Sequence, residues 1–394
     1  MKSFARFLAV VAVMGLAVTA QALNTLPGGV FTAGDLAVYR VGDGSGALAA
    51  VSTVVFVDEY DTAGNFLGSL SMTTGVNPFT ATGNATSEGL MTLSADGLSL
   101  VLPGYDVAAG TPTPNTATAV AVPREVGVIG SLLSGPTIDT STALTNVDSG
   151  GNIRGVASPD GTKFYITGSV SGPQYAPISA SLAGTFSIAA AGGPVNTRGV
   201  VISGGNLLIS DQSGANVRIS QVDGPGLPTV AGGNTVVVSD TALPGTSGAF
   251  PSGPYAFTFL TLTTGGSTPD TMYVANDLGS TVVKYSLVGG TWLSNGTVAV
   301  TAPRGITATY TVVGGVTNVQ IFGTSGISTS ITNIFEITDS SGFNATISNN
   351  ITNIAFAASN ENFRGIAFLV PEPSTVALVG AGLFGLLALR RRRS

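Results

Sequence analysis

Arginine recurs at one position of a repeated sequence unit, directly before a glycine and an apolar run. Guanidinium groups form forked hydrogen bonds with carboxylates, so arginines gathered at one place would bind an anion or a sugar acid. Alternatively, each arginine has a structural role and bonds to carbonyl groups or acids of neighbouring strands. The structural interpretation carries more weight from sequence alone, and both stay open. The candidate site residues are Arg154, Arg198, Arg304 and Arg364, with Glu88 at the corresponding place in another copy.

A second polar group, Asp58, Glu59 and Asp61, is the densest acidic cluster in the chain. With Asn65 it offers the oxygen ligands that Ca²⁺ prefers. The spacing lacks a complete calcium loop with its distal glutamate, and a solvated strand end explains the cluster better. Ca²⁺ is therefore a weak prediction, and no other cofactor is expected.

The absent residue types restrict the chemistry further. The chain has no cysteine and no histidine, which removes the usual zinc sites, the Ser-His-Asp triad, the cysteine nucleophile and disulfides. An enzyme would have to use carboxylates, lysine, tyrosine or a hard metal ion. No catalytic residue is identified, so a non-catalytic protein is the first expectation.

The elements that would position these residues are short strands joined by turns. The chain contains 54 glycines, and only 9% of its residues are charged. Turn sequences such as Ser94–Gly97 and Ser158–Gly161 separate Thr- and Val-rich runs, a texture typical of an all-β fold. Copies of the unit start at 88, 154, 198, 255, 304 and 364, intervals that fit four-stranded propeller blades of roughly 40–50 residues with insertions.

The two ends of this region complete each other. The last copy supplies only a first strand, Gly365 to Leu369, whereas "GDLAVYRVG" from Gly34 reads as a second strand, followed by "VVFVDEYD" and "GNFLGSL". One blade built from both termini would close the ring and remove open sheet edges. The sequence thus predicts a β-propeller over residues 23–369, with six blades as the preferred number. A β-sandwich or a solenoid is the alternative.

The N-terminal residues 1–22 have the pattern of a secretory signal peptide. Lys2 and Arg6 precede an apolar run over residues 7–18, and Ala20-Gln21-Ala22 follows as a cleavage site. We expect the mature chain to begin at Leu23. The protein is therefore predicted to be exported.

The C-terminal residues 370–394 form a three-part signal. Pro371, Glu372 and Pro373 precede an apolar run from Val376 to Leu389, and the chain then ends in a basic cluster of Arg390, Arg391, Arg392 and Arg393. A helix over this run would be barely long enough to span a bilayer. The arginines after it would stay on the cytoplasmic side. The run also matches G-x-G-x-x-G, but no strand follows it to complete a nucleotide-binding unit.

This order of features resembles the PEP-CTERM sorting signal. The resemblance implies a Gram-negative bacterium that makes extracellular polysaccharide. It also implies recognition by an exosortase-type enzyme, cleavage near the Pro-Glu-Pro, and delivery to the outer surface or extracellular matrix. Membrane contact through the C-terminal helix would be transient.

The body resembles, more loosely, the six-bladed NHL and lactonase-type propellers, through the strand "DTMYVAND" at 270–277. Lactonase-type propellers bind a divalent cation with acids and amides, and Asp211, Asn276 and Asp277 follow second-strand runs here. No complete ligand set is identifiable, so a divalent-metal-dependent hydrolase of lactones or esters remains the alternative function. The preferred function is a non-catalytic surface or matrix protein that binds acidic polysaccharide.

The net charge of the processed chain limits the classes of molecule that it can bind. Processing at both ends would leave nine of the 15 basic groups against 21 acidic ones, a net charge of −12. An acidic surface of this kind excludes nucleic acid as a partner, because nucleic acid requires a basic one.

Overall fold

The computed structural model describes residues 24–179, 186–188, 193–212, 217–228, 239–246, 253–326 and 332–370. These residues form strands that pair antiparallel, together with two short 3₁₀ helices, η1 (Pro27–Gly29) and η2 (Met72–Thr74). Hydrogen bonding divides the strands into one nine-stranded sheet and four four-stranded sheets. The expected all-β class is confirmed.

The four smaller sheets follow one another along the chain, and within each the strands pair in sequence order. The first contains β9 (Ile153–Ala157), β10 (Lys163–Gly168), β11 (Gln174–Pro177) and β12 (Phe186–Ser187). The second contains β13 (Thr197–Ser203), β14 (Asn206–Asp211), β15 (Arg218–Val222) and β16 (Asp240–Ala242). The third contains β17 (Pro254–Leu260), β18 (Thr271–Asn276), β19 (Thr281–Val288) and β20 (Thr291–Ala299). The fourth contains β21 (Pro303–Val313), β22 (Val316–Ser325), β23 (Asn333–Asp339) and β24 (Ile351–Phe356).

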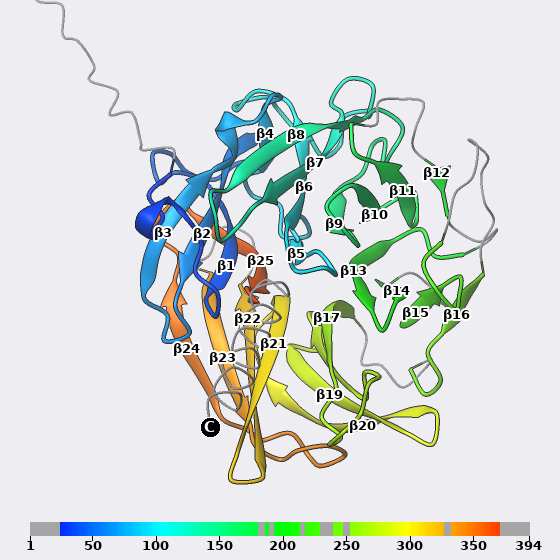
Figure 1. Ribbon diagram of the computed structural model, residues 1–394. Helices are drawn as coiled ribbons and strands as arrows, with labels where there is room; N and C mark the ends of the chain where they lie inside the picture. The colour runs from blue at the N-terminus through cyan, green and yellow to red at the C-terminus, as the bar shows by residue number, and fades with distance from the viewer. Residues whose placement is uncertain are drawn as a thin grey trace, which may run out of the picture.

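The nine-stranded sheet joins the two ends of the body. It contains β1 (Leu36–Val41), β2 (Ser52–Tyr60), β3 (Phe66–Ser71), β4 (Phe79–Thr82), β5 (Thr92–Leu93), β6 (Leu100–Asp106), β7 (Arg124–Gly130), β8 (Thr137–Leu144) and β25 (Asn362–Phe368). The C-terminal strand β25 pairs with β1, and β1 pairs with β2. This pairing of the termini, which the sequence predicted, is visible in Figure 1 where β25 lies beside β1.

The sheets stand around a common centre, as in a β-propeller (Figure 1). The innermost strands β5, β9, β13, β17, β21 and β25 contact one another in that order, and β25 contacts β5 to close the circle. Apolar clusters fill the spaces between neighbouring sheets; one of them joins Tyr273 and Val282 of the third small sheet to Ile321 and Phe335 of the fourth.

Glycines after the arginines allow the inner strands to approach closely. A Cβ built on Gly199 would lie 2.6 Å from the carbonyl oxygen of Tyr255, and one on Gly305 would lie 2.6 Å from that of Arg364. The hydroxyl group of Ser210 donates to the same Tyr255 carbonyl oxygen at 2.5 Å and accepts from Gly199 N–H at 2.8 Å. Thr324 makes the corresponding contacts beside Gly305: its hydroxyl accepts from Gly305 N–H at 2.9 Å and donates to the Arg364 carbonyl oxygen. These two junctions therefore share the same pair of features, a glycine and a hydroxyl group.

Candidate functional site

A β-bulge aims the recurrent arginines toward the centre of the ring. Thr197 pairs with Asp211 and Val200 with Ile209, so Arg198 and Gly199 together stand opposite the single residue Ser210. Corresponding register shifts occur beside Arg154, Tyr255, Arg304 and Arg364. A bulge re-aims a side chain without ending the strand, and here it places one residue from each of β9, β13, β17, β21 and β25 in a common layer. Glu88, in the segment before β5, contacts this layer through Arg364. We call the residues Glu88, Arg154, Arg198, Tyr255, Arg304 and Arg364 the central layer.

One half of the central layer is a two-arginine cluster around an aromatic ring. The guanidinium carbons of Arg198 and Arg304 lie 4.9 Å and 4.7 Å from the centroid of the Tyr255 ring. Asp277 Oδ2 accepts from Nη1 of Arg198 at 3.1 Å and from Nη1 of Arg304 at 2.7 Å. The Tyr255 hydroxyl donates to the carbonyl oxygen of Thr86 at 3.3 Å and so fixes the ring. One carboxylate therefore faces two cations that pack on one aromatic ring, which leaves these three groups with a net positive charge.

The other half is a buried clamp between Arg364 and Glu88. Arg364 donates to Glu88 Oε2 at 3.3 Å and to the carbonyl oxygens of Thr82 and Gly83 at 2.5 Å and 3.1 Å. Glu88 also accepts from Tyr105 Oη at 2.8 Å. Both side chains are only 2% exposed. Their contacts join β25 to the segment before β5, a structural role.

Arg154 lies between these two halves and is also buried. Its Nη1 donates to Asn196 Oδ1 and, at 3.0 Å, to the carbonyl oxygen of Thr197. Burial is the main cause that lowers its pKa, and the nearby charge of Arg198 lowers it further. Arg154 therefore brings a third guanidinium near the two-arginine cluster, while the nearby charges of Asp148 and Asp211 act to raise its pKa.

The two halves differ in accessibility. The side chains of Arg198 and Arg304 keep 13% and 16% of their surface, compared with 2% for Arg364. Within the described part of the chain, the Nε atoms of all four arginines are buried and lack a hydrogen-bond partner. The structure thus brings the predicted residues together, but it leaves only the pair Arg198 and Arg304 open to solvent.

A cavity of about 490 Å³ occupies the other end of the inner strands. Its walls include one or more residues from every innermost strand: Thr92, Ala157, Val201, Thr258, Thr307 and Phe368 are examples. None of the four arginines lines it. The ring of strands therefore has two faces. We call the face that contains this cavity the cavity face, and we call the opposite face, which carries the central layer, the arginine face.

The acidic residues proposed for Ca²⁺ do not converge. Asp58 is buried and accepts from Arg40 Nε at 2.5 Å, whereas Glu59, next along β2, accepts from Thr32 N–H at 2.5 Å. Asp61 caps its own exposed turn through Asn65. Successive strand residues point to opposite faces, which separates the first two carboxylates. In the described ranges, no three acidic groups are placed to hold a metal ion.

Asp277 is the member of the cluster that sequence reasoning did not select as a site residue. It follows the last residue of β18, where Asn276 takes the register position that Asp211 has at the end of β14. The recurrence of acid and amide residues at these strand ends is the signal that was available. The neighbouring Asn276 has a local role, since its Oδ1 accepts from Gly253 N–H at 2.9 Å.

The predicted sorting residues Pro371, Glu372, Pro373 and Arg390 to Arg393 lie outside the described residues, as does the predicted signal peptide. Over the part of the chain that the structure covers, no helix has the length and apolar character needed to cross a membrane.

Comparisons with known proteins identify the C-terminal region. The family model for the PEP-CTERM protein-sorting motif matches residues 369–393. The chain thus carries a PEP-CTERM motif, which places it among exported proteins that an exosortase-type system recognises and sorts at the membrane. No curated protein matches the chain.

Several solved structures are similar in fold at low identity. A functionally unknown protein from Desulfotomaculum acetoxidans is 16% identical, with 76% of this chain and 75% of that one covered and a TM-score of 0.37. AofleA from Arthrobotrys oligospora is 12% identical, with coverage of 88% and 93% and a TM-score of 0.42. The soluble aldose sugar dehydrogenase of Escherichia coli is 10% identical, with coverage of 71% and 90% and a TM-score of 0.38.

Proposed function

We propose that this chain is an exported, non-catalytic β-propeller that binds the end of a carboxylated saccharide through Arg198 and Arg304. The supporting observation is that two partly exposed guanidinium groups flank Tyr255 and share the single carboxylate Asp277. Guanidiniums fixed by packing lose little freedom on binding and match a carboxylate in shape.

The architecture in this proposal has six blades over residues 23–369. The nine-stranded sheet counts as two blades, one built on β25 and one on β5, because six innermost strands surround the centre. Residues 1–22 are the signal peptide and 370–394 the sorting signal. Intact mass spectrometry of the exported product tests these boundaries: we expect Leu23 at the N-terminus and no arginine tail. An exported product that keeps the four arginines would refute the processing.

The ligand is short or is bound at its end. The whole chain carries 21 acidic groups against 15 basic ones, so a long polyanion laid across the surface is repelled. The side chains of Arg198 and Arg304 keep only 13% and 16% of their surface, an exposed area that suits one carboxylate. A terminal uronic acid meets both conditions.

Thermal melts with trigalacturonate test this site. Because a ligand that binds only the folded state raises the melting temperature, a hundredfold excess over Kd should add about 2.7 kcal/mol of stability. The variant with Arg198→Gln and Arg304→Gln should lose this response. The matched control is Arg218→Gln, which removes an arginine that pairs with Asp240 on the outer strands and should keep the response. Neutral maltotriose should have no effect on any of the proteins.

The double variant should melt below the wild type under either account, because it leaves Asp277 without its two cations and each lost buried hydrogen bond costs about 1–3 kcal/mol. The response to ligand is what discriminates. A purely structural role for the pair predicts that the wild type does not respond to trigalacturonate, and that result would reject binding at this cluster.

A further inference from the structure

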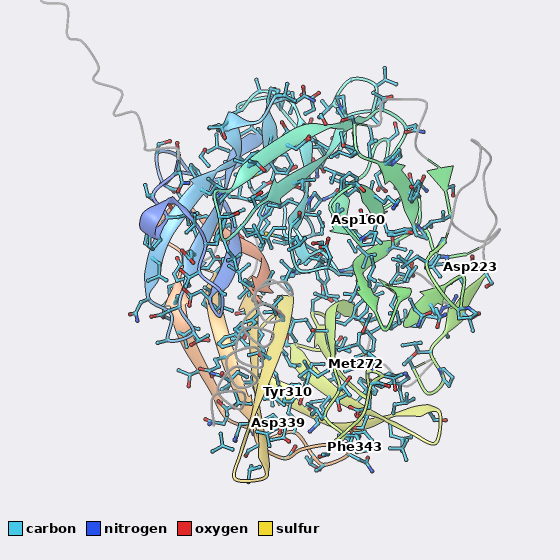
Figure 2. All side chains as sticks on the ribbon, viewed as in Figure 1. Asp160, Asp223, Met272, Tyr310, Asp339 and Phe343 are labelled. Atoms are coloured by element: carbon cyan, nitrogen blue, oxygen red, sulfur yellow. The ribbon has the colours of Figure 1, made fainter. Side chains whose placement is uncertain are left out.

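One hairpin projects from the cavity face with an apolar, uncharged tip. Strands β21 and β22 are joined by Gly314 and Gly315, whose φ angles of 59° and 81° fit a two-residue hairpin turn. All residues from 310 to 316 are exposed, which means that both sides of the ribbon extend beyond the packed sheets. We call residues 310–316 the valine hairpin; Tyr310 is labelled on it in Figure 2.

The composition of the valine hairpin is unusual for a protruding element. Tyr310 is 41% exposed, and Val312, Val313 and Val316 are 59%, 67% and 49% exposed. No charged residue lies between Arg304 and Glu336. Apolar side chains gathered at one protruding place indicate an interaction surface, whereas single exposed ones need no explanation.

The chain leaves the body on the same face. β25 lies beside β21, and Phe368 N–H donates to Thr307 Oγ1 at 3.2 Å, so the two strands end toward the same side. Val370, which lines the rim of the cavity, is therefore nearly level with Thr309. Four further residues carry β21 to Val313, about 13 Å at 3.3 Å per residue. The hairpin tip thus extends past the point where the described chain ends.

The length of chain between Val370 and the C-terminal apolar run limits how far the body can lie from a membrane that the run enters. From Val370 to Val376 the chain spans at most about 20 Å even when fully extended. If residues 376–389 enter a bilayer during sorting, the cavity face must stand close to its surface. The valine hairpin covers more than half of that gap, and an aromatic ring next to valines suits the boundary between headgroups and hydrocarbon.

We propose that the valine hairpin inserts into the headgroup region of a zwitterionic lipid surface and holds the cavity face toward the membrane while the Pro-Glu-Pro segment is processed. The acidic body makes anionic lipid a poor partner, and a hairpin without charge needs no electrostatic attraction. Amphipathic helices at a membrane surface bury their apolar face to a depth of about 5–10 Å, and the hairpin is long enough to reach the same depth. This inference does not depend on saccharide binding by Arg198 and Arg304.

Depth-dependent fluorescence quenching tests the proposal, and the absence of native cysteine makes single labelling simple. The exported full-length chain, anchored in phosphatidylethanolamine-rich vesicles, would carry a bimane label at Val313→Cys. The matched control is Val120→Cys, which is 76% exposed and lies between β6 and β7. That segment belongs to the arginine face, because Arg124 at its end donates to the carbonyl oxygen of Gly151 before β9.

We expect nitroxide lipids to quench the label at 313 several-fold more than the label at 120. Adding Val312→Asp and Val316→Asp should reduce quenching at 313 to the control value, with an unchanged melting temperature. Equal quenching at 313 and 120 would overturn the proposal, as would quenching that survives both aspartates. Quenching that appears only when the sorting enzyme is present in the vesicles would show a protein partner instead of lipid and would also overturn it.

Discussion

Replacement of Lys284 by methionine should destabilise the junction between two neighbouring sheets. Lys284 in β19 has no exposed surface, and its Nζ donates to Asp339 Oδ2 at 2.8 Å, Ser341 Oγ at 2.7 Å and the Gly342 carbonyl oxygen at 2.7 Å. Tyr273 Oη donates to the same Asp339 oxygen at 2.8 Å. Figure 2 shows where Asp339 lies, at the end of β23.

The expected loss follows from leaving Asp339 buried without its cation. Breaking a buried ion pair in this way costs about 3–5 kcal/mol. Unfolding entropy of about 2.1 cal/mol/K per residue then converts this cost into a melting temperature lower by about 4–7 °C for a body of this size. The Lys284→Met, Asp339→Asn double variant should recover part of the loss, because the amide carries no unpaired charge and keeps an oxygen for Tyr273 Oη.

The pH dependence of the stability deficit tests whether the unpaired charge of Asp339 causes it. Burial raises the pKa of Asp339, but hydrogen bonds from Lys284 and Ser341 outweigh it and hold the pKa below its ordinary value. A lowered carboxyl pKa contributes stability above the unfolded pKa of about 3.9, and this contribution is lost as pH falls through the folded pKa. The deficit of Lys284→Met should therefore be largest near pH 7 and shrink toward pH 3.

Differential scanning fluorimetry across this pH range measures the effect, with Lys163→Met as the control. Lys163 also pairs with an acid, Asp160, but its side chain is 53% exposed, so its loss should leave the melting temperature unchanged. A Lys284→Met variant that melts like the control, or a deficit that does not depend on pH, would refute this reasoning.

Two further predictions concern the scaffold. Burial raises the pKa of Asp148 to about 6, so stability falls as pH rises from the unfolded pKa of about 3.9 to about 6 and stays lower above it. Asp148→Asn, which keeps an oxygen for Val170 N–H, should therefore melt higher than the wild type at pH 8 and equally at pH 4. A difference that is the same at both pH values would contradict this. Gly305→Ala would place Cβ 2.6 Å from the Arg364 carbonyl oxygen and should cost about 1–3 kcal/mol by chemical denaturation. Gly46→Ala, where a Cβ meets nothing within 4 Å, should be neutral, and equal stability of the two variants would argue against close contact between the inner strands.

Sequence periodicity predicted the elements of the fold more completely than the details of the site. The alternation of apolar runs and turns located inner strands such as β13 and β21, and the incomplete last unit correctly predicted that β25 pairs with β1. These features could be predicted from the sequence because they depend on the local pattern of apolar residues and on the need to pair the free N–H and C=O groups of an edge strand.

The pairing within the central layer was not accessible from sequence. Arg198 and Arg364 occupy equivalent positions, yet Arg198 pairs with Asp277 of the neighbouring sheet and Arg364 pairs with Glu88 and two carbonyl groups. The difference depends on loops that the repeat does not specify. The bulge that aims these side chains also leaves little sequence signal apart from the glycine after each arginine.

Equilibrium binding of trigalacturonate to the wild-type protein and to Asp277→Asn, by isothermal titration calorimetry at low salt, tests the central claim most directly. Asp277 is the carboxylate that holds both guanidinium groups, and asparagine keeps the oxygen that accepts from Leu278 N–H. If a ligand carboxylate binds the same pair, the wild type should bind one equivalent, and removal of the competing charge should tighten binding about tenfold. Absence of binding to both proteins, while both remain folded, would contradict the account.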